Sequence, residues 1–322
     1  HAARPEVQPA AVVAAFEDAI ASIGVGRALS TDTTAQSDRG LSVVVPAHNA
    51  EDTLGEQLHA LLSQDWTPGF EVLVVDNVSA DGTAELVRGR AQTDGRLRLV
   101  EAANGRNAAA ARNAGVAAAR FESIAFCDAD DVVSEAWVKA MGHALEDHSL
   151  VAGRVNVRTL NSPSLAEARG LAVGEGPGQF GPVPFAHGCN IGVRRALLVS
   201  VGGWDDTVAT GEDIELCLRL WRHGVKLHYE PAAEIHYRYR ASESASWRQA
   251  VRYGAAHVDL ARRLEVRQLP VPSRFQGFRN LAWLVRHCSD LTDERRRAHW
   301  IWTAGLSAGH LQGSARWATM YL

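Results

Sequence analysis

The sequence predicts an α/β protein with a mostly parallel central sheet flanked by helices. From residue 41 onward, short apolar runs alternate with helical patterns, which is the order typical of a parallel sheet covered on both faces. The first run, LSVVV, is apolar throughout, as expected for a strand buried on both faces. Three runs end in polar or acidic residues, in VVVPAHN, LVVDN and AFCDADD. Because ligands bind at the carboxyl ends of such strands, we expect these ends to converge on one crevice.

The elements of the first half follow from strand and helix periodicity. In the 49–65 segment, Leu54, Leu58, Leu61 and Leu62 fall on one side of a helix, which indicates a face packed on the sheet. Strands are expected at 41–45, 71–76, 97–102 and 123–128, and helices at 49–65, 79–92, 107–120 and 132–141.

After residue 150 the pattern is looser. An edge strand is predicted at 150–160, and a Gly/Pro-rich loop at 174–185 that could close over a ligand as a lid. Further expected elements are strand, helix and turn in 187–206, a helix after 210 with Ile214, Cys217, Leu218 and Trp221 inward, strands at 226–230 and 233–240, and a helical tail over 243–322. We divide the chain into an N-terminal helix and linker (1–40), a main domain (41–240) and a helical extension (241–322).

Composition limits the possible functions. The chain is 46% hydrophobic and 22% charged with a net charge of −4, so it lacks the basic excess typical of nucleic-acid binding. Its four cysteines have no metal-binding spacing, and we expect reduced thiols in a cytoplasmic protein. No apolar run approaches the roughly 18 residues that span a bilayer, and the first residues lack a signal-peptide pattern.

The tail is rich in arginine and tryptophan. Trp283, Trp300, Trp302 and Trp317 lie among many arginines. Two interpretations are open: aromatic packing, on the main domain or between subunits, and a peripheral contact of the C-terminal helices with an anionic membrane.

The stretch FCDADD carries the strongest chemical signal. Asp128, Asp130 and Asp131 place three carboxylates within four residues, directly after an apolar strand. Clustered carboxylates repel one another unless a positive charge lies between them, and a divalent cation is the usual solution. The alternative, a helix N-terminus, explains one carboxylate, which we take to be Asp131.

A dinucleotide-binding domain is the obvious competitor for this fold class. Its first strand is normally followed by GxGxxG, whereas PAHNAED follows here, and no GxxxxGK[ST] phosphate loop occurs. The crevice must therefore hold its ligand by other means.

The ordered motifs of residues 41–240 resemble those of family 2 glycosyltransferases. The matching pieces are VVVPAHN, VVDNVSADGT, ARNAG, FCDADD, HGCNIGVRR, GGWDD, GEDIELCLRLWRHG and EIHYRYR. The resemblance implies the GT-A fold and an inverting, metal-dependent transfer of a sugar from a nucleotide-diphosphate sugar to an acceptor nucleophile. The acceptor is unknown: a glycan, a lipid-linked molecule, a peptide and a small molecule are all open.

The resemblance also implies roles for the metal and its ligands. A Mn²⁺ or Mg²⁺ ion would neutralise the leaving diphosphate. Asp130 matches the metal ligand, and Asp128 matches the residue that reaches the ribose or the metal and its waters. His236 matches a further metal ligand of some members, with an ordinary strand histidine as the alternative.

By the same resemblance, the nucleotide pocket is made of Pro46, Ala47, His48, Asp76 and Arg112. Asp76 matches the carboxylate that accepts the ring N–H of the base, which favours UDP, with dTDP and GDP as alternatives. The family often has a second acid after it, where this chain has Asn77. For Arg112, a surface helix arginine is the alternative interpretation.

On the acceptor side, Asp213 matches the general base and Glu212 a residue that positions acceptor or sugar. Gly188 and Asn190 match residues that border the donor sugar. Trp204 is either an apolar wall for a sugar ring or a packing residue. Two other functions remain as alternatives: a nucleotidyltransferase, and a catalytically silent protein that binds nucleotide sugars.

Overall fold

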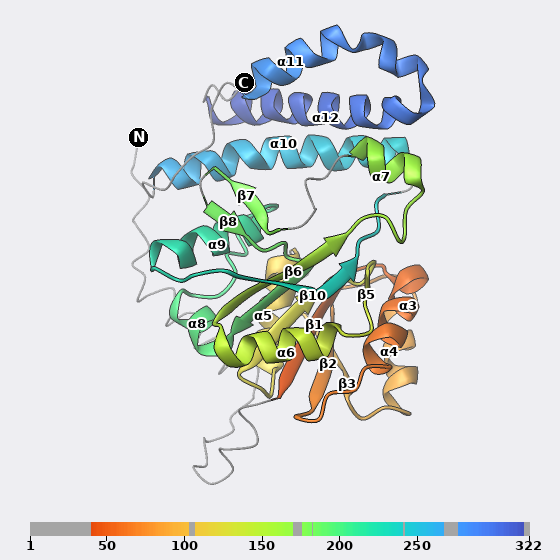
Figure 1. Cartoon of the computed structure of the whole chain (residues 1–322), viewed down its shortest axis with the longest axis vertical. Coiled ribbons are helices and arrows are strands. Elements are labelled where there is room, and N and C mark those ends of the chain that lie inside the picture. The colour runs from red at the N-terminus through yellow and green to blue at the C-terminus, as the bar shows by residue number, and fades with distance from the viewer. Residues whose placement is uncertain are drawn as a thin grey trace.

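The computed structural model describes residues 40–102, 107–169, 176–181, 183–240, 242–266 and 276–318. The helix and linker predicted for residues 1–40 therefore lie outside the described residues, apart from Gly40. Figure 1 shows one twisted sheet with helices on both faces and a stack of long helices at one end.

The central sheet has eight strands among the described residues, in the order β3-β2-β1-β4-β9-β6-β10-β5. The strands are β1 (Leu41–Ala47), β2 (Phe70–Asp76), β3 (Leu97–Glu101), β4 (Ser123–Cys127), β5 (Val132–Val133), β6 (Leu150–Asn156), β9 (Asn190–Arg194) and β10 (His228–His236). Strands β1 to β4 pair in parallel, as do β6 and β10, whereas β9 runs antiparallel between β4 and β6. The mostly parallel sheet predicted from the sequence is confirmed.

Helices cover both faces because successive strand residues point to opposite sides. The helices of this part are α3 (Glu51–Leu62), α4 (Thr83–Ala91), α5 (Ala108–Ala118), α6 (Trp137–Asp147), α7 (Pro163–Arg169), α8 (Arg195–Ser200) and α9 (Glu212–Arg222). On β1, Val43 and Val45 belong to the core shared with α3, α4 and α6, whereas Val44 belongs to the core shared with α5 and α9.

Several element predictions need correction. The 150–160 strand is β6, which lies inside the sheet between β9 and β10 and is buried on both faces. The helix predicted from residue 132 begins at Trp137, because the preceding Val132 and Val133 pair with β10 as β5. Trp221 is 43% exposed, since it lies in the last turn of α9 beyond the edge of the core. The strands at 226–230 and 233–240 form one bulged strand, β10, which ends at His236.

The Gly/Pro-rich segment is a hairpin and not a plain loop. Strands β7 (Gly178–Phe180) and β8 (Val183–Phe185) pair antiparallel outside the main sheet. Phe180, Val183 and Phe185 are buried in the core on the α5 and α9 side. Residues 170–175 and 182 lie outside the described residues, so the lid stays a prediction.

The C-terminal extension is helical, as predicted. It contains α10 (Glu243–Val266), α11 (Gln276–Arg286), the short 3-10 helix η1 (Cys288–Thr292) and α12 (Glu294–Trp317). Figure 1 shows α10, α12 and α11 stacked in that order away from the sheet. Leu260 and Leu264 of α10 join the core of the sheet, which fixes the extension to the main domain. None of the described helices combines the length and the apolar character needed to cross a membrane.

Helices α10 and α12 approach each other through glycines. A Cβ atom added at Gly254 would lie 2.2 Å from the Leu306 carbonyl oxygen, and one at Gly309 would lie 2.2 Å from the Val251 carbonyl oxygen. Only residues without a side chain allow two helix backbones to come this close. The GxxxGxxxG spacing from Gly305 to Gly313 therefore forms the contact face of α12.

Candidate active site

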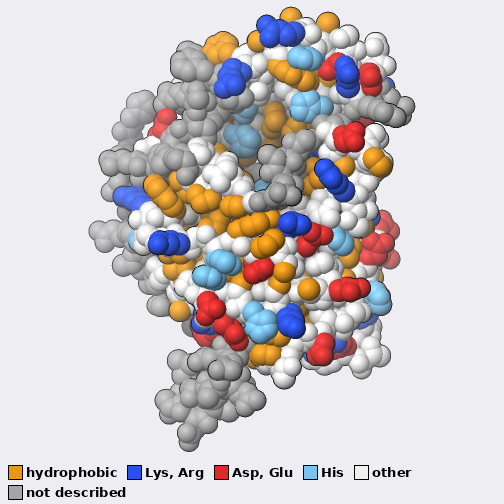
Figure 2. Space-filling model, viewed as in Figure 1, with side chains coloured by type: hydrophobic (Ala, Val, Ile, Leu, Met, Phe, Trp, Pro, Cys, Tyr) orange, Lys and Arg blue, Asp and Glu red, His pale blue; other side chains and the backbone are white. Residues whose placement is uncertain are grey.

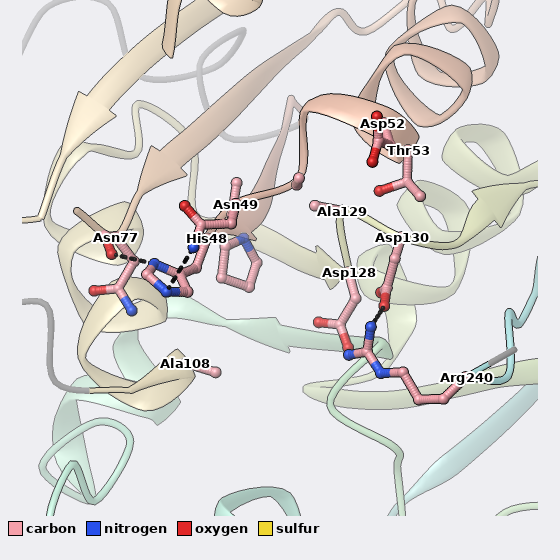
Figure 3. A pocket seen from close by; sticks show the side chains of 13 residues that line it. His48, Asn49, Asp52, Thr53, Asn77, Ala108, Asp128, Ala129, Asp130 and Arg240 are labelled. Atoms are coloured by element: carbon pink, nitrogen blue, oxygen red, sulfur yellow. Dashed lines mark hydrogen bonds and ion pairs between the residues drawn. The ribbon is translucent and has the colours of Figure 1, made fainter. Parts of the chain in front are cut away.

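The carboxyl ends of β1, β2 and β4 meet at one edge of the sheet, as predicted, and border a pocket of about 420 Å³ (Figure 3). That volume lies in the range of small-molecule sites. Three carboxylates and one arginine line the pocket, so its charge favours a cation over a bare phosphate. The lining residues are Pro46, Ala47, His48, Asn49, Ala50, Asp52, Thr53, Asn77, Ala108, Asp128, Ala129, Asp130 and Arg240.

The three aspartates after β4 form a compact group. The carboxylate oxygens of Asp128, Asp130 and Asp131 lie within 4.8 Å of one another. Burial raises the pKa of Asp128, although Arg112 opposes this effect. Burial also raises the pKa of Asp131 well above its ordinary value, and the charges of Asp130 and Asp128 add to the shift. Like charges this close need a compensating cation.

Asp131 does not cap a helix, and the prediction that it does is wrong. The residue before α6 is Ala136, and Asp131 is only 1% exposed. Its Oδ1 accepts the backbone N–H of Arg238 at 2.8 Å, while its Oδ2 is buried without a hydrogen-bond partner among the described residues. A buried carboxylate oxygen without a partner, beside two further carboxylates, fits an all-oxygen site for Mg²⁺ or Mn²⁺.

Two buried glutamines, Gln57 of α3 and Gln64 just after its end, hold the aspartate segment in place. Gln57 donates to the Asp128 carbonyl at 3.0 Å and accepts the Val133 N–H at 3.0 Å. Gln64 donates to the Ser134 carbonyl at 2.6 Å and accepts the Val138 N–H at 3.0 Å. Sequence reasoning missed both residues. The only indication of them in the sequence was that each is a polar residue on the apolar side of a predicted helix.

Arg112 joins the two halves of the site. It is 3% exposed, which excludes the surface interpretation. Its Nη1 donates to Glu212 Oε1 at 2.7 Å and its Nη2 donates to Asp128 Oδ1 at 3.1 Å. Burial alone would lower the pKa of Arg112, but Asp128 and Glu212 outweigh it and the pKa is raised. Arg112 thus bridges the two carboxylates and does not line the nucleotide pocket predicted for it.

The rest of the ARNAG motif explains how Arg112 reaches this position. Asn113 donates to the Trp204 carbonyl and accepts the Trp204 N–H, both at 2.9 Å. A Cβ atom at Gly115 would lie 2.3 Å from Val44, so this glycine lets α5 close against β1. Trp204 is 2% exposed and lies beneath the Arg112 guanidinium. It is therefore a packing residue, and the alternative of a wall for a sugar ring is wrong.

Asp213 and Glu212 open α9 at the far side of Arg112. Asp213 Oδ2 accepts the Gly188 N–H at 2.9 Å, and its Oδ1 accepts the Ile214 N–H at 2.8 Å. Burial, together with the charge of Glu212, raises the pKa of Asp213 to about 6. A carboxylate with a pKa near neutrality is suited to general base work. Gly188 is buried against Arg112, where a Cβ atom would lie 2.9 Å from Nη2.

The Asn190 side chain is used in hydrogen bonds that hold neighbouring segments of the fold together. Its side chain is fully buried and donates to the Arg154 and Ala233 carbonyls, both at 2.8 Å, while accepting from the Trp137 indole at 2.8 Å. Because its amide hydrogens are already used and no surface is exposed, the prediction that it borders the donor sugar is corrected.

His236 stands apart from the aspartates. Within the described residues, the group that could hold a metal contains only the three aspartates. The His236 Nε2 atom lies 3.2 Å from Glu234 Oε1 instead. The structure therefore favours the strand interpretation of this histidine over metal ligation.

At the other end of the pocket, His48 and Asn77 lie side by side (Figure 3). His48 Nδ1 is 2.9 Å from the Asn77 carbonyl oxygen. The Asn77 side-chain oxygen is buried without a hydrogen-bond partner among the described residues. Asp76 is not among the lining residues and lies 3.4 Å from the Ser79 N–H. The polar groups presented at this end thus come from Asn77 and His48, and Pro46 and Ala47 line the pocket beside them.

Known proteins share this sequence pattern and fold. A model of glycosyl transferase family 2 matches residues 42–202, and one of glycosyl transferase family group 2 matches residues 123–307. The pre-mycofactocin glycosyltransferase of Mycobacterium tuberculosis is 28% identical over 260 residues, which cover 77% of this chain and 53% of that protein. The chain spans about half the length of the first curated relatives it matches.

Solved structures agree on the fold. The mannosyltransferase PcManGT from Pyrobaculum calidifontis, in complex with GDP-Man and Mn²⁺, has a TM-score of 0.60 at 19% identity and covers 94% of this chain and 98% of its own. S. aureus TarS in complex with UDP-GlcNAc has a TM-score of 0.51 at 18% identity and covers 88% of this chain and 93% of its own. The expected GT-A fold is confirmed, and the chain belongs to the family 2 glycosyltransferases.

Proposed function

We propose that this protein transfers a sugar from a nucleotide-diphosphate sugar to an acceptor, with inversion and with the help of a divalent metal ion. The observation that carries the proposal is the aspartate group beside a carboxylate whose pKa is raised to about 6, joined through Arg112. The aspartate group suits the binding of a metal-bound diphosphate, and Asp213 suits the removal of a proton from an acceptor.

The residues divide the reaction between them. Asp130 and Asp128, together with the corrected Asp131, would hold Mn²⁺ or Mg²⁺, which supplies positive charge to the leaving diphosphate. Asp213 accepts the acceptor's proton as its nucleophilic atom attacks the anomeric carbon. Glu212 and Asp128 are held in place by Arg112, so the metal side and the base side keep a fixed spacing.

The nucleobase is recognised at the end of the pocket that holds His48 and Asn77. An amide offers both a donor and an acceptor, so Asn77 can pair with a ring N–H and with an adjacent carbonyl, as in uracil, thymine or guanine, once its side chain turns so that the buried Oδ1 faces the pocket. The neighbours named above bind GDP-Man and UDP-GlcNAc, so UDP, dTDP and GDP all stay candidates. Asp76 would act as a second partner for the base only after it leaves the Ser79 N–H, which lies 3.4 Å from both of its carboxylate oxygens.

The alternatives are weaker on this geometry. Nucleotidyl transfer does not require a carboxylate of raised pKa at the position of Asp213, on the far side of the aspartate group. A catalytically silent binder would not need Asp213 in an environment that raises its pKa. The residue range 41–240 is proposed as the catalytic domain and 241–322 as an extension packed on it. A cytoplasmic location is proposed from the nucleotide-sugar donor and the four free thiols.

We also propose a peripheral membrane contact, through a surface other than the one the sequence suggested. The four tryptophans named from the sequence are half-buried and each has a packing partner: Trp283 stacks on His287, Trp300 donates to the Leu284 carbonyl, Trp302 lies under Arg169 and Trp317 under Arg262. Three of the exposed apolar side chains of the extension lie together on α11, where Phe278, Leu281 and Val285 are 47%, 54% and 71% exposed, whereas Trp247, Leu291 and Leu311 stand singly on α10, η1 and α12.

This α11 face fits an anionic lipid surface. The helix contains Arg279 and Arg286, both exposed, and no acidic residue. Figure 2 shows hydrophobic and basic side chains at the top of the view, where Figure 1 places α11. An amphipathic helix of this kind lies in the membrane interface with its apolar side buried.

The proposed function is tested by binding of nucleotides with and without metal. Calorimetry would titrate UDP, GDP and dTDP into the protein with Mn²⁺, with Mg²⁺ and with chelator. We expect one nucleotide to bind tightly only when metal is present. Equal binding with chelator would contradict metal dependence, and hydrolysis or transfer assays with the matching sugar nucleotides would then identify the donor.

A further inference from the structure

The three aspartates differ in how their charge is balanced. Asp128 pairs with Arg112, and Asp131 accepts the backbone N–H of Arg238. Asp130 pairs with Arg240, whose Nη1 lies 3.1 Å from Asp130 Oδ2. Figure 3 shows the Arg240 guanidinium paired with Asp130, at the end of the pocket opposite His48.

The arginines around this group are held very differently. Arg112 is 3% exposed and fixed by two carboxylates. Arg238 donates from Nε to the Asp130 carbonyl at 3.0 Å and pairs with Glu56. The Arg240 side chain is 53% exposed, and Asp130 is its one ion-pair partner among the described residues. Arg240 is therefore the cation that can move without breaking the core.

A metal ion and Arg240 cannot share Asp130 without cost. A divalent cation bound to the aspartate group would lie within a few ångströms of the guanidinium, where like charges repel strongly in a partly buried pocket. Binding of metal must then release Arg240 from Asp130. The released side chain still lines the same pocket.

We propose that Arg240 is an exchangeable counter-ion, which balances Asp130 in the metal-free protein and moves to the donor diphosphate when metal binds. This inference rests on the proposed function. The planar guanidinium offers paired N–H donors that match phosphate oxygens. The other lining charges, on Asp52, Asp128 and Asp130, are negative, so Arg240 is the lining side chain suited to the phosphates.

The exchange couples the two ligands. Arg240 opposes metal binding in the absence of nucleotide, because it occupies the carboxylate. It favours nucleotide binding once metal is present, because it is then free. Metal and nucleotide should therefore increase each other's affinity, and by linkage the factor is the same in both directions.

The test is Arg240→Met, which keeps an unbranched stem of similar reach up to the guanidinium and removes the charge. Mn²⁺ affinity without nucleotide would be measured from the spectrum of free Mn²⁺ by electron paramagnetic resonance. Affinity for UDP, GDP and dTDP would be measured calorimetrically at saturating Mn²⁺. Arg88→Met is the matched control, since Arg88 of α4 is 51% exposed, is paired with Glu85 of the same helix and Glu101 of β3, and does not line the pocket.

We expect the two affinities to change in opposite directions. In Arg240→Met, Mn²⁺ alone should bind several-fold more tightly, and the nucleotide should bind about 10- to 100-fold more weakly, within the usual range of coupling between sites. Arg88→Met should change neither. A variant in which both affinities fall, or neither changes, would overturn the exchange. Wild-type protein that binds neither Mn²⁺ nor any of the three nucleotides would contradict the proposed function itself, and this inference with it.

Discussion

The edge of the sheet that carries the site and the α10–α12 pair are held together by opposite kinds of contact. At the site, charged and amide side chains join segments far apart in the chain: Arg112 reaches Glu212, 100 residues away, and Gln57 reaches Val133, 76 residues away. Between α10 and α12, backbones meet at glycines, with almost no space for a side chain.

The two regions differ in whether their contacts can rearrange when a ligand binds. The site holds more carboxylates than arginines, and one of those arginines is half exposed, so its charges can be rearranged when a ligand arrives. The helix pair has a single arrangement, since an atom added at Gly254 or Gly309 meets the backbone of the other helix. Substitutions at the site should therefore alter chemistry and binding with little loss of stability, and substitutions in the helix pair should do the reverse.

The largest effect is expected from Asp213→Asn. The variant cannot accept a proton, so turnover should fall by about 10²–10⁴-fold, the usual range for a lost general base. Because both Asp213 oxygens accept backbone N–H groups, the new amide group will face one of them, and the melting temperature must be measured alongside. Donor affinity should change little. Near wild-type transfer to a genuine acceptor would show that the base is another residue.

The pH profile gives an independent check on the same residue. Burial and Glu212 raise the pKa of Asp213 to about 6, and the base works only when ionised. Activity should therefore fall as the pH drops below about 6. This acid limb should be absent from the residual activity of Asp213→Asn. An unchanged limb in the variant would assign it to another group.

The next effect is expected from Asp130→Ala. Loss of outer-shell partners typically costs about 10–100-fold in metal affinity, so loss of a ligand should cost at least that much. Calorimetry with Mn²⁺ and UDP or GDP measures it, and Asp52→Ala is the control because Asp52 lines the same pocket outside the aspartate group. The fold should keep its stability. If both variants lose affinity equally, the effect is the general charge of the pocket and not ligation.

Two glycine substitutions test the same comparison through the stability of the protein. Gly309→Ala would place a Cβ atom 2.2 Å from the Val251 carbonyl oxygen, and overpacking of this kind costs about 1–3 kcal/mol. Gly55→Ala in α3 meets nothing within 4 Å and should stabilise the protein by about 0.5–1 kcal/mol. Urea denaturation measures both. Equal stability of the two variants would mean that α10 and α12 separate easily.

The same contrast explains how far the sequence could be interpreted. Strand ends, the aspartate cluster and the motifs of residues 41–240 predicted the fold and part of the pocket lining, because strand periodicity and chain order determine which ends meet. The bridge from Arg112 to Glu212 and the support from Gln57 depend on contacts across the fold, which one sequence does not display. Asp131 was misassigned because a short strand, β5, separates it from the helix it was expected to cap.

In the C-terminal region the sequence identified helices but not their partners. The glycine spacing from Gly305 to Gly313 indicates a close contact without saying which helix makes it. The tryptophans left packing and membrane contact both open, and each of the four has a packing contact in the structure, since large aromatic side chains are as suited to packing as to an interface. The exposed face of α11 became visible only when the packing of its other face was known.

The smallest expected effect concerns that face. Leu281→Glu combined with Val285→Glu replaces two exposed apolar residues by acids, which should reduce binding to vesicles containing phosphatidylglycerol by about tenfold or more, because apolar insertion and attraction to the anionic surface are both lost. Leu311→Glu on α12, where the leucine is 55% exposed, is the matched control and should bind as the wild type does. Sedimentation with vesicles at low and physiological salt measures the change, and wild-type binding should weaken as salt rises. Binding to neutral phosphatidylcholine vesicles should be weak throughout.

If the double variant instead converts a dimer to a monomer in light scattering, with vesicle binding unchanged, α11 is an interface between copies of this chain and the membrane proposal is wrong.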